Sequence, residues 1–368
     1  MKPKLLFLWE NIGPMHQDRL SALIEHDYQV VGVEVTSQSN TYSWVSDETN
    51  GYVKKTLFLN QSTHNLSQVK IMLKLMLTCI PLKEHHFFFC HYEQPYVFFT
   101  AILLKLLGRK VFVMNNAKFD DSSRNILLEL VKVVLYSPYN GALVGSERAS
   151  AYLSLLGMKN RPKVLGYNTL SIERIRTNSG TVPAPKGLPF DKRHFSIISR
   201  LVPKKNLFMA IDAYTLYASK VQNPRPLHIY GDGPLESKLQ EYIVKKKQLN
   251  NVILHGFIQS DDISKALGQT LALLLPSSEE QFGNVVIEAQ AMGVPVLATY
   301  LCGAADELIR DGINGFTFTP DNPEGLAFFM HEVCQRKDMW NSLSKGTELT
   351  VYLGDTKRFV SGISRLID

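Results

Sequence analysis

Two acidic side chains, Glu280 and Glu288, flank a glycine-bearing turn in the stretch EEQFGNVVIEAQAMGVPVLAT, residues 279–299. Seven residues separate the two acids. The apolar run 271–276 predicts a buried strand just before the stretch, so Glu280 falls in the loop at the carboxyl end of that strand. Carboxylates in such a loop can accept hydrogen bonds from the hydroxyl groups of a ligand.

The turn between the two acids predicts the start of a helix. Asn284 is a favourable N-cap residue and Gly293 a favourable stop, which predicts a short helix from Val285 to Met292. The N–H groups of Gly283, Asn284 and Val285 would then face outward and hold an anion, beside the aromatic side chain of Phe282. An anion flanked by two hydroxyl-binding acids describes a nucleoside diphosphate sugar. In the alternative interpretation, Glu288 only complements the helix dipole and Glu280 is a solvated loop acid.

Two cations, Arg200 and Lys205, follow a predicted strand in ISRLVPKKNL, residues 198–207. A guanidinium and an ammonium at a strand end can neutralise a diphosphate and the charge that grows on it as it leaves. A basic surface loop is the alternative interpretation of the same residues.

Two further loops of the second half carry candidate binding residues. In IYGDGPLESKL, residues 229–239, a predicted strand runs into a Gly-Asp-Gly turn at Gly231 and then into a helix. Such a turn alone specifies little, because it is common in α/β proteins. In HGFIQSDD, residues 255–262, Phe257 either lies beside a base or packs in the core.

Polar residues also follow the predicted strands of the first half. Gly13 lies in the loop after the first strand and could let the backbone approach a ligand, and His16 follows it. His91, Asn115 and Lys118 stand after two later strands. Ligands of open parallel sheets bind beyond the carboxyl ends of the strands, so all five are candidates, although for any single residue a structural role is the commoner one.

Strand-like runs alternate with helical ones throughout, which predicts an α/β fold with parallel sheets. The stretch 177–192 is rich in Pro, Gly and polar residues and is typical of an interdomain linker. The pattern therefore predicts a first domain over residues 1–180 and a second over 190–345. A C-terminal helix within 350–368 is expected to pack back on the first domain, with Phe359, Ile363 and Leu366 forming one apolar stripe.

The net charge of +6 over 368 residues is unevenly distributed. Residues 1–180 hold 20 Lys and Arg against 14 Asp and Glu, whereas the remainder holds 20 of each. Nucleic acid is not expected as a partner, because no binding motif is recognisable and the basic residues are scattered. An anionic membrane surface or an acidic acceptor fits better, and an ordinary solvated surface remains the third interpretation.

The four cysteines show neither paired nor metal-type spacing, which favours a reducing compartment and no zinc site. The first apolar run is too short for a signal peptide, and no run of about 18 apolar residues predicts a membrane span. The apolar segment 69–83 contains interspersed lysines. It either lies on a bilayer surface or is an ordinary buried helix whose lysine stems cover apolar surface.

These motifs resemble, as an ordered set, the retaining glycosyltransferases of family four, which have the GT-B fold. The set consists of Arg200 with Lys205, the turn 231–234, the E-x7-E pair of acids and the stretch GAADELIRDGINGF, residues 303–316. The resemblance covers about residues 194–318. The first half is similar to the family only in its architecture. The resemblance implies two Rossmann-like, doubly wound domains that face each other across a cleft.

The resemblance also implies roles for the candidate residues. Glu280 would hold hydroxyls of the donor sugar and Glu288 the ribose, while Arg200 and Lys205 would bind the diphosphate. Glu280, Arg200 and Lys205 are the expected catalytic residues. Gly13 would approach the phosphate from the first domain, and neither a metal nor another cofactor is expected. Attack would occur on the face that the leaving group departs from, and the departing phosphate would take the acceptor proton.

One feature departs from the family pattern. Many members carry a histidine after the fourth or fifth strand of the first domain. On the predicted strands, Asn115 stands where such a histidine is expected and His91 lies one strand earlier. The departure leaves the catalytic contribution of the first domain unassigned.

The sequence thus predicts a hexosyltransferase that uses a UDP- or GDP-sugar and a glycan or lipid-linked saccharide as acceptor. Its expected place is the cytoplasm, peripheral on the inner face of the cytoplasmic membrane through the basic first domain. Two alternatives stay open. One is a nucleotide-sugar epimerase-like enzyme on the same fold, and the other is a catalytically silent binding partner.

Overall fold

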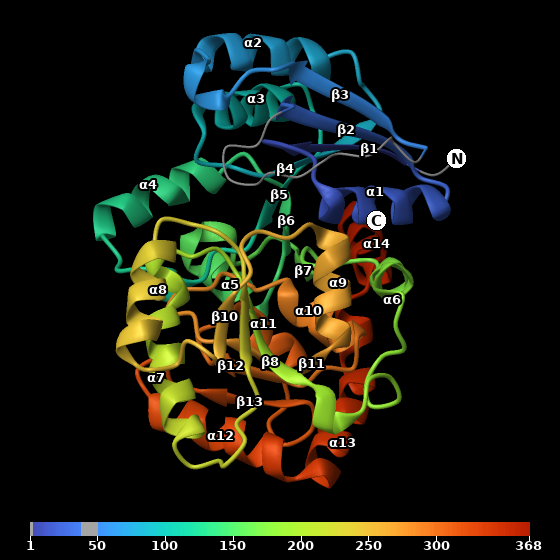
Figure 1. The fold of residues 1–368 in the computed structure, drawn as a ribbon. Coiled ribbons are helices and arrows are strands. Elements are labelled where there is room, and N and C mark those ends of the chain that lie inside the picture. The colour runs from blue at the N-terminus through green and yellow to red at the C-terminus, as the bar shows by residue number, and fades with distance from the viewer. Residues whose placement is uncertain (1–2, 38–50) are drawn as a thin grey trace. The chain divides into compact units, whose positions relative to one another are not determined.

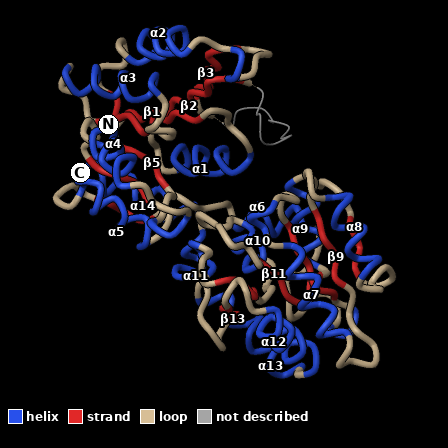
Figure 2. Tube along the Cα trace, turned by 90° about the vertical axis from the view of Figure 1, so that its left-hand side faces the viewer, coloured by secondary structure: helices blue, strands red, loops and turns tan. Residues whose placement is uncertain are grey.

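The computed structural model describes residues 3–37 and 51–368, which form two compact units (Figure 1). The first unit contains the chain up to Phe119, then Ser123–Leu170 and Thr356–Asp368. The second contains Asp120–Ser122 and Ser171–Asp355. Each unit is built around one parallel sheet with helices on both faces, and Figure 2 shows the helices and strands of both. The predicted α/β class with two Rossmann-like domains is confirmed.

The first sheet has seven parallel strands in the order β3-β2-β1-β4-β5-β6-β7. The strands are β1 Lys4–Trp9, β2 Gln29–Thr36, β3 Val53–Phe58, β4 His85–Phe89, β5 Val111–Asn115, β6 Gly141–Val144 and β7 Lys163–Leu165. One face packs against α1 (Pro14–Glu25) and α14 (Thr356–Ile367). The other face packs against α2 (Gln68–Cys79), α3 (Pro95–Leu106) and α5 (Glu147–Leu153), and α4 spans Ile126–Tyr136.

The second sheet has six parallel strands in the order β10-β9-β8-β11-β12-β13. The strands are β8 His194–Ile198, β9 Leu227–Tyr230, β10 Val252–Leu254, β11 Thr270–Leu275, β12 Val296–Thr299 and β13 Gly315–Phe318. Its main core is closed by α7 (Leu207–Ala218), α8 (Glu236–Lys245), α12 (Pro323–Gln335) and α13 (Lys337–Gly346). The remaining helices are α6 (Ile172–Ser179), α9 (Ser260–Gly268), α10 (Val285–Ala291) and α11 (Gly303–Leu308).

The central strands are recognisable in the sequence because parallel strands are buried on both faces and read as continuous apolar runs. All six residues of β11, TLALLL, are buried, as are five of the six in β1. The strand β3, VKKTLF, was not predicted, because it is an edge strand in which only one residue is buried. An edge strand gains little from burial, so its sequence carries lysines in place of an apolar run.

The segment 69–83, predicted either to lie on a bilayer surface or to be buried, is buried on one side and exposed on the other. It forms α2, whose buried residues are Ile71, Leu75 and Cys79. Three other residues of the helix are more than half exposed, namely Val69, Leu73 and Leu77. The amino group of Lys74 donates to the backbone carbonyl of Leu57, so this lysine serves the fold.

The chain leaves the first unit after Leu170 and returns at Thr356. In α14, the three residues predicted to form an apolar stripe, Phe359, Ile363 and Leu366, are all buried against the first sheet. The structure differs from the sequence analysis at the stretch 177–192, which was expected to link the domains. That stretch belongs to the second unit, where the Ala184 N–H donates to the carbonyl of Met292 at 2.9 Å.

Candidate active site

The topology of the second sheet brings two candidate loops together. β8 and β11 are hydrogen-bonded neighbours, and the strand order changes direction between them. In a parallel sheet this switch point opens a crevice at the carboxyl ends of the strands, where ligands bind. The loop after β8 carries Arg200 and Lys205, and the loop after β11 carries Glu280.

Lys205 and Glu280 form an ion pair at this switch point. The amino group of Lys205 donates to Glu280 Oε2, and the two side chains are only 13 % and 14 % exposed. Ser277 Oγ lies 3.4 Å from the same carboxylate oxygen. The backbone joins the loops as well, because the Ser278 N–H donates to the carbonyl of Lys204 at 2.9 Å. A largely buried pair is screened less by solvent than a surface pair.

The turn after β12 fixes the loop that carries Glu280. Glu280 forms an isolated parallel bridge with Cys302, and its carbonyl accepts from the Gly303 N–H at 3.2 Å. The carbonyl of Phe282 accepts from the Cys302 thiol at 2.7 Å and from the Ala304 N–H at 2.9 Å. Burial, followed by the charge of Glu280, raises the pKa of the Cys302 thiol to about 12. Cys302 was not among the residues predicted for the site.

Gly231 holds the end of β9 against the end of β8. Its φ is +132°, and a Cβ at this position would lie 1.9 Å from the carbonyl oxygen of Ser199, the residue before Arg200. Only glycine fits such a close approach in this backbone conformation. The Gly231 N–H donates to the carbonyl of Gly256 at 2.7 Å, one residue before the 40 % exposed Phe257.

The predicted short helix exists as α10, and Gly293 follows it with a φ of +70°. Asn284 occupies the N-cap position, but its side chain makes no capping hydrogen bond to the helix, contrary to the prediction. Its backbone is already helical, whereas a side-chain cap normally uses an extended N-cap residue. Glu288 lies half-buried in the first turn, and Phe282 is buried.

The first unit has its own switch point, between β1 and β4. Gly13 follows β1 and caps α1, and its N–H donates to Nδ1 of His16 at 3.0 Å. The His16 ring is buried 4.6 Å from that of Trp9. Burial, with the charge of Arg19, holds the pKa of His16 well below its usual value, so the ring is neutral at pH 7.

The other candidates of the first unit differ in exposure. The side chain of His91 is 40 % exposed and lies 3.8 Å from Glu93 Oε1. Asn115 donates to the Tyr136 hydroxyl at 2.9 Å and accepts from the Ala117 N–H at 3.0 Å, so the fold uses both ends of its amide. Lys118 is buried. β3 is not apparent in the sequence, and on the observed strands His91 follows the fourth strand while Asn115 ends the fifth.

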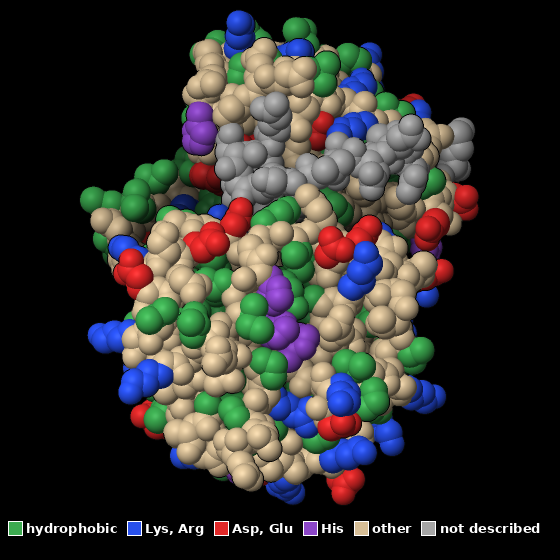
Figure 3. Space-filling model, in the orientation of Figure 1, with side chains coloured by type: hydrophobic (Ala, Val, Ile, Leu, Met, Phe, Trp, Pro, Cys, Tyr) green, Lys and Arg blue, Asp and Glu red, His purple; other side chains and the backbone are tan. Residues whose placement is uncertain are grey.

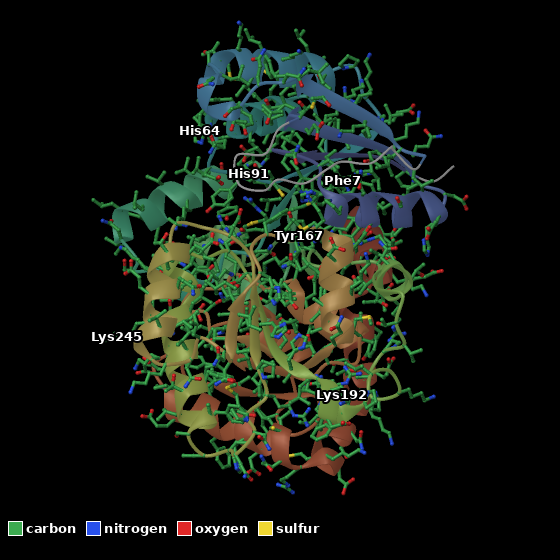
Figure 4. The ribbon with its side chains drawn as sticks, in the orientation of Figure 1. Phe7, His64, His91, Tyr167, Lys192 and Lys245 are labelled. Carbon is green, nitrogen blue, oxygen red and sulfur yellow. The ribbon has the colours of Figure 1, made fainter. Side chains whose placement is uncertain are left out.

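A polar cluster near the switch point of the first sheet was not predicted from the sequence. Tyr167 is labelled in Figure 4. Its hydroxyl accepts a hydrogen bond from the Trp9 indole at 3.2 Å and lies 2.9 Å from the Cys90 sulfur. Arg19 lies over the Tyr167 ring at 4.9 Å and donates to the carbonyl of Thr169 at 3.1 Å. In the sequence, the only sign of this cluster is an arginine, Arg19, within the apolar pattern of a short helix.

Within residues 3–37 and 51–368, no cluster of three or more His, Cys, Asp or Glu side chains could hold a metal ion. The same residues include no helix with the length and apolar character needed to cross a membrane.

Comparison with known proteins finds a family model that matches the second half of the chain. Residues 181–348 match the family model described as glycosyl transferases group 1. An uncharacterised glycosyltransferase of Methanocaldococcus jannaschii is 28 % identical over 188 residues, which is 51 % of this chain and 48 % of the relative. A poly(glycerol-phosphate) alpha-glucosyltransferase of Bacillus subtilis is 32 % identical over 144 residues, 39 % of this chain and 21 % of the relative. The chain thus spans less than half the length of either relative.

Solved structures resemble the whole chain. HepE of Anabaena, in complex with UDP and glucose, superposes with a TM-score of 0.76 at 18 % identity and covers 100 % of this chain and 99 % of its own. Sucrose-phosphate synthase of Thermosynechococcus elongatus superposes with a TM-score of 0.72 at 15 % identity, covering 100 % and 98 %. These similarities establish the GT-B fold that the sequence motifs implied.

Proposed function

We propose, from the match of residues 181–348 to the family model described as glycosyl transferases group 1, that the protein transfers a hexose from a nucleoside diphosphate sugar. The acceptor would be a glycan or a lipid-linked saccharide. The observation that carries the proposal is the Lys205–Glu280 pair, held with little exposure at the switch point of the second sheet. The HepE structure with UDP and glucose supports a nucleotide sugar as the donor class.

The proposed roles follow from charge and position. The diphosphate is the group that leaves, and negative charge grows on it as the bond to the sugar breaks. Arg200 and Lys205, on the loop after β8, would neutralise that charge. The backbone amides of Gly283, Asn284 and Val285 would add hydrogen bonds to a phosphate.

The acids act on the neutral parts of the donor. Glu280 would accept hydrogen bonds from sugar hydroxyls, and Glu288 from the ribose. The contact between Glu280 and Lys205 orients both side chains before the ligand arrives, so less order has to be gained on binding. Cys302 holds the loop that carries Glu280 and is a positioning residue in this scheme.

We further propose that the reaction retains the anomeric configuration. The acceptor would attack from the face that the diphosphate leaves, and the departing phosphate would take the acceptor proton, so no strong protein base is needed. The first unit would contribute the acceptor side, where His91 is the most exposed of the candidates. Peripheral contact of the basic first unit with an anionic membrane would bring a lipid-linked acceptor within reach.

The test measures nucleotide binding first and donor turnover second. Binding at a ligand concentration of about 100 times Kd stabilises the folded protein by about 2.7 kcal/mol, which a thermal shift detects. We expect UDP or GDP to raise the melting temperature. Mass spectrometry should then detect release of free sugar from the matching nucleotide sugar.

Lys205→Met should weaken nucleotide binding at least about tenfold, whereas Lys204→Met is the matched control, since that side chain is exposed. The proposal fails if no nucleotide changes the melting temperature. Interconversion of donor sugars without any transfer would instead favour the epimerase alternative, and binding without turnover would favour a silent partner.

A further inference from the structure

The helix α4 turns its charged side chains inward and its apolar side chains outward. Six of its residues are between 53 and 76 % exposed, namely Ile126, Leu127, Leu128, Leu130, Val131 and Val134. Figure 3 shows hydrophobic side chains gathered over this helix. A surface helix normally buries its apolar stripe against its own domain. The exposed apolar face of α4 therefore indicates a contact with another molecule or a membrane.

The inward side of α4 is held by a polar network. Glu129 accepts hydrogen bonds from Lys132, at 2.8 Å, and from the Tyr152 hydroxyl, and Arg124 donates to the same hydroxyl at 3.0 Å. Although partial burial opposes it, these hydrogen bonds lower the pKa of Glu129, so its carboxylate stays ionised. The Asn125 side chain accepts from the Leu127 N–H at 2.9 Å and caps the helix. The outward apolar face is therefore fixed by specific contacts.

The width of the apolar arc indicates what covers it. Successive residues of an α-helix are rotated by about 100°, so the six exposed residues span an arc of about 200°. A helix packed on a protein core buries a stripe little wider than about 100°. A rigid partner would therefore leave much of this arc in water, whereas the acyl chains of a bilayer can surround it.

Charges at the C-terminal end of α4 point to the same occupant. At its end, Lys105 donates to the carbonyl of Ser137 at 2.8 Å and Arg161 to that of Tyr136 at 2.8 Å. The one acid of the helix is turned inward, as described above. Cations around an apolar surface suit anionic headgroups around acyl chains.

We propose that α4 inserts its apolar arc into the interface of an anionic lipid bilayer and lies in its plane. The helix has 11 residues and is about 16 Å long, so it suits an interfacial position and not a span. Leu155, 71 % exposed on the adjoining turn Ser154–Met158, extends the inserted surface. This inference rests on the membrane contact within the proposed function and assigns it to one helix.

The experiment uses the full chain and flotation with vesicles of phosphatidylcholine, with or without phosphatidylglycerol. We expect the protein to float with the phosphatidylglycerol vesicles and less at high salt. The double variant Leu127→Gln and Val134→Gln should reduce the partition coefficient about tenfold or more, because two apolar side chains no longer transfer to the interface. The control variant Val244→Gln and Leu349→Gln makes the same changes at residues 54 and 65 % exposed in the second unit and should float like the wild type.

Two measurements keep the outcomes distinct. The thermal shift with UDP or GDP should be the same for the wild type and the α4 variant, so a lost vesicle interaction would not reflect a failed nucleotide site. The inference is overturned if the wild type does not float, or if the α4 variant floats as well as the control. It is also overturned if light scattering shows a wild-type dimer that the α4 variant dissociates, because a second copy would then cover the helix.

Discussion

The ion pair between Lys205 and Glu280 offers the most direct test of the site. We consider Lys205→Met, Glu280→Gln and the double variant. Two unit charges about 3 Å apart attract by about 5 kcal/mol at an effective dielectric constant of 20. Desolvation of groups that are only 13 and 14 % exposed offsets more than half of this attraction. We therefore expect a coupling free energy of about 2 kcal/mol, with Lys205→Met the most destabilising variant because it leaves the carboxylate without its cation.

The assay follows the unfolding of the second unit alone. The protein has three tryptophans, and Trp340 is the one that lies buried in the second unit. In a background with Trp9→Phe and Trp44→Phe, urea unfolding monitored by fluorescence reports the surroundings of Trp340. A double-mutant cycle in this background gives the coupling directly. Additive effects, with a coupling below about 0.5 kcal/mol, would refute the ion pair as an organising contact of the site.

Three further predictions concern stability and reactivity. Gly231→Ala should lower the free energy of unfolding by about 3 kcal/mol or more, because the new Cβ would meet a backbone carbonyl at 1.9 Å. At Gly312 a Cβ would have no atom within 4 Å, so Gly312→Ala should lower it by only about 1 kcal/mol, for the positive φ. Urea unfolding compares the two variants, and equal losses would contradict the close approach at Gly231. Cys302, with a pKa of about 12, should not react with a thiol reagent in the folded protein and should react fully in urea. Peptide mapping locates the labelled cysteine, and rapid labelling of Cys302 in the folded protein would contradict its burial. Burial first, and then the neighbouring charges, lower the pKa of His194 to about 3. The unfolded state therefore binds a proton that the folded state does not. As the pH is lowered from 6.5 to 5, the contribution of His194 should reduce the free energy of unfolding by about 2 kcal/mol. His194→Phe should flatten that pH profile, and an unchanged slope would show that another group titrates.

Much of the fold could be read from the sequence because buried parallel strands are apolar throughout. The motif residues were found for a related reason: they follow such strands. The direct contact of Lys205 with Glu280 could not be predicted, since it depends on β8 and β11 being neighbours. Cys302 and Tyr167 were missed because each acts through contacts with residues distant in the sequence. Asn284 shows the opposite error, where a favourable residue type stands at the right position without making the expected hydrogen bond.

The return of the chain to its first sheet has a consequence for biosynthesis. Phe359 of α14 lies 5.7 Å from Phe7, so Phe7 is translated well before this partner. Nearly all of the other unit, Ser171–Asp355, is one uninterrupted stretch and can fold while the ribosome is still at work. We therefore expect the first unit to be completed after the second, with the α1 face of its sheet open to chaperones until α14 has been synthesised.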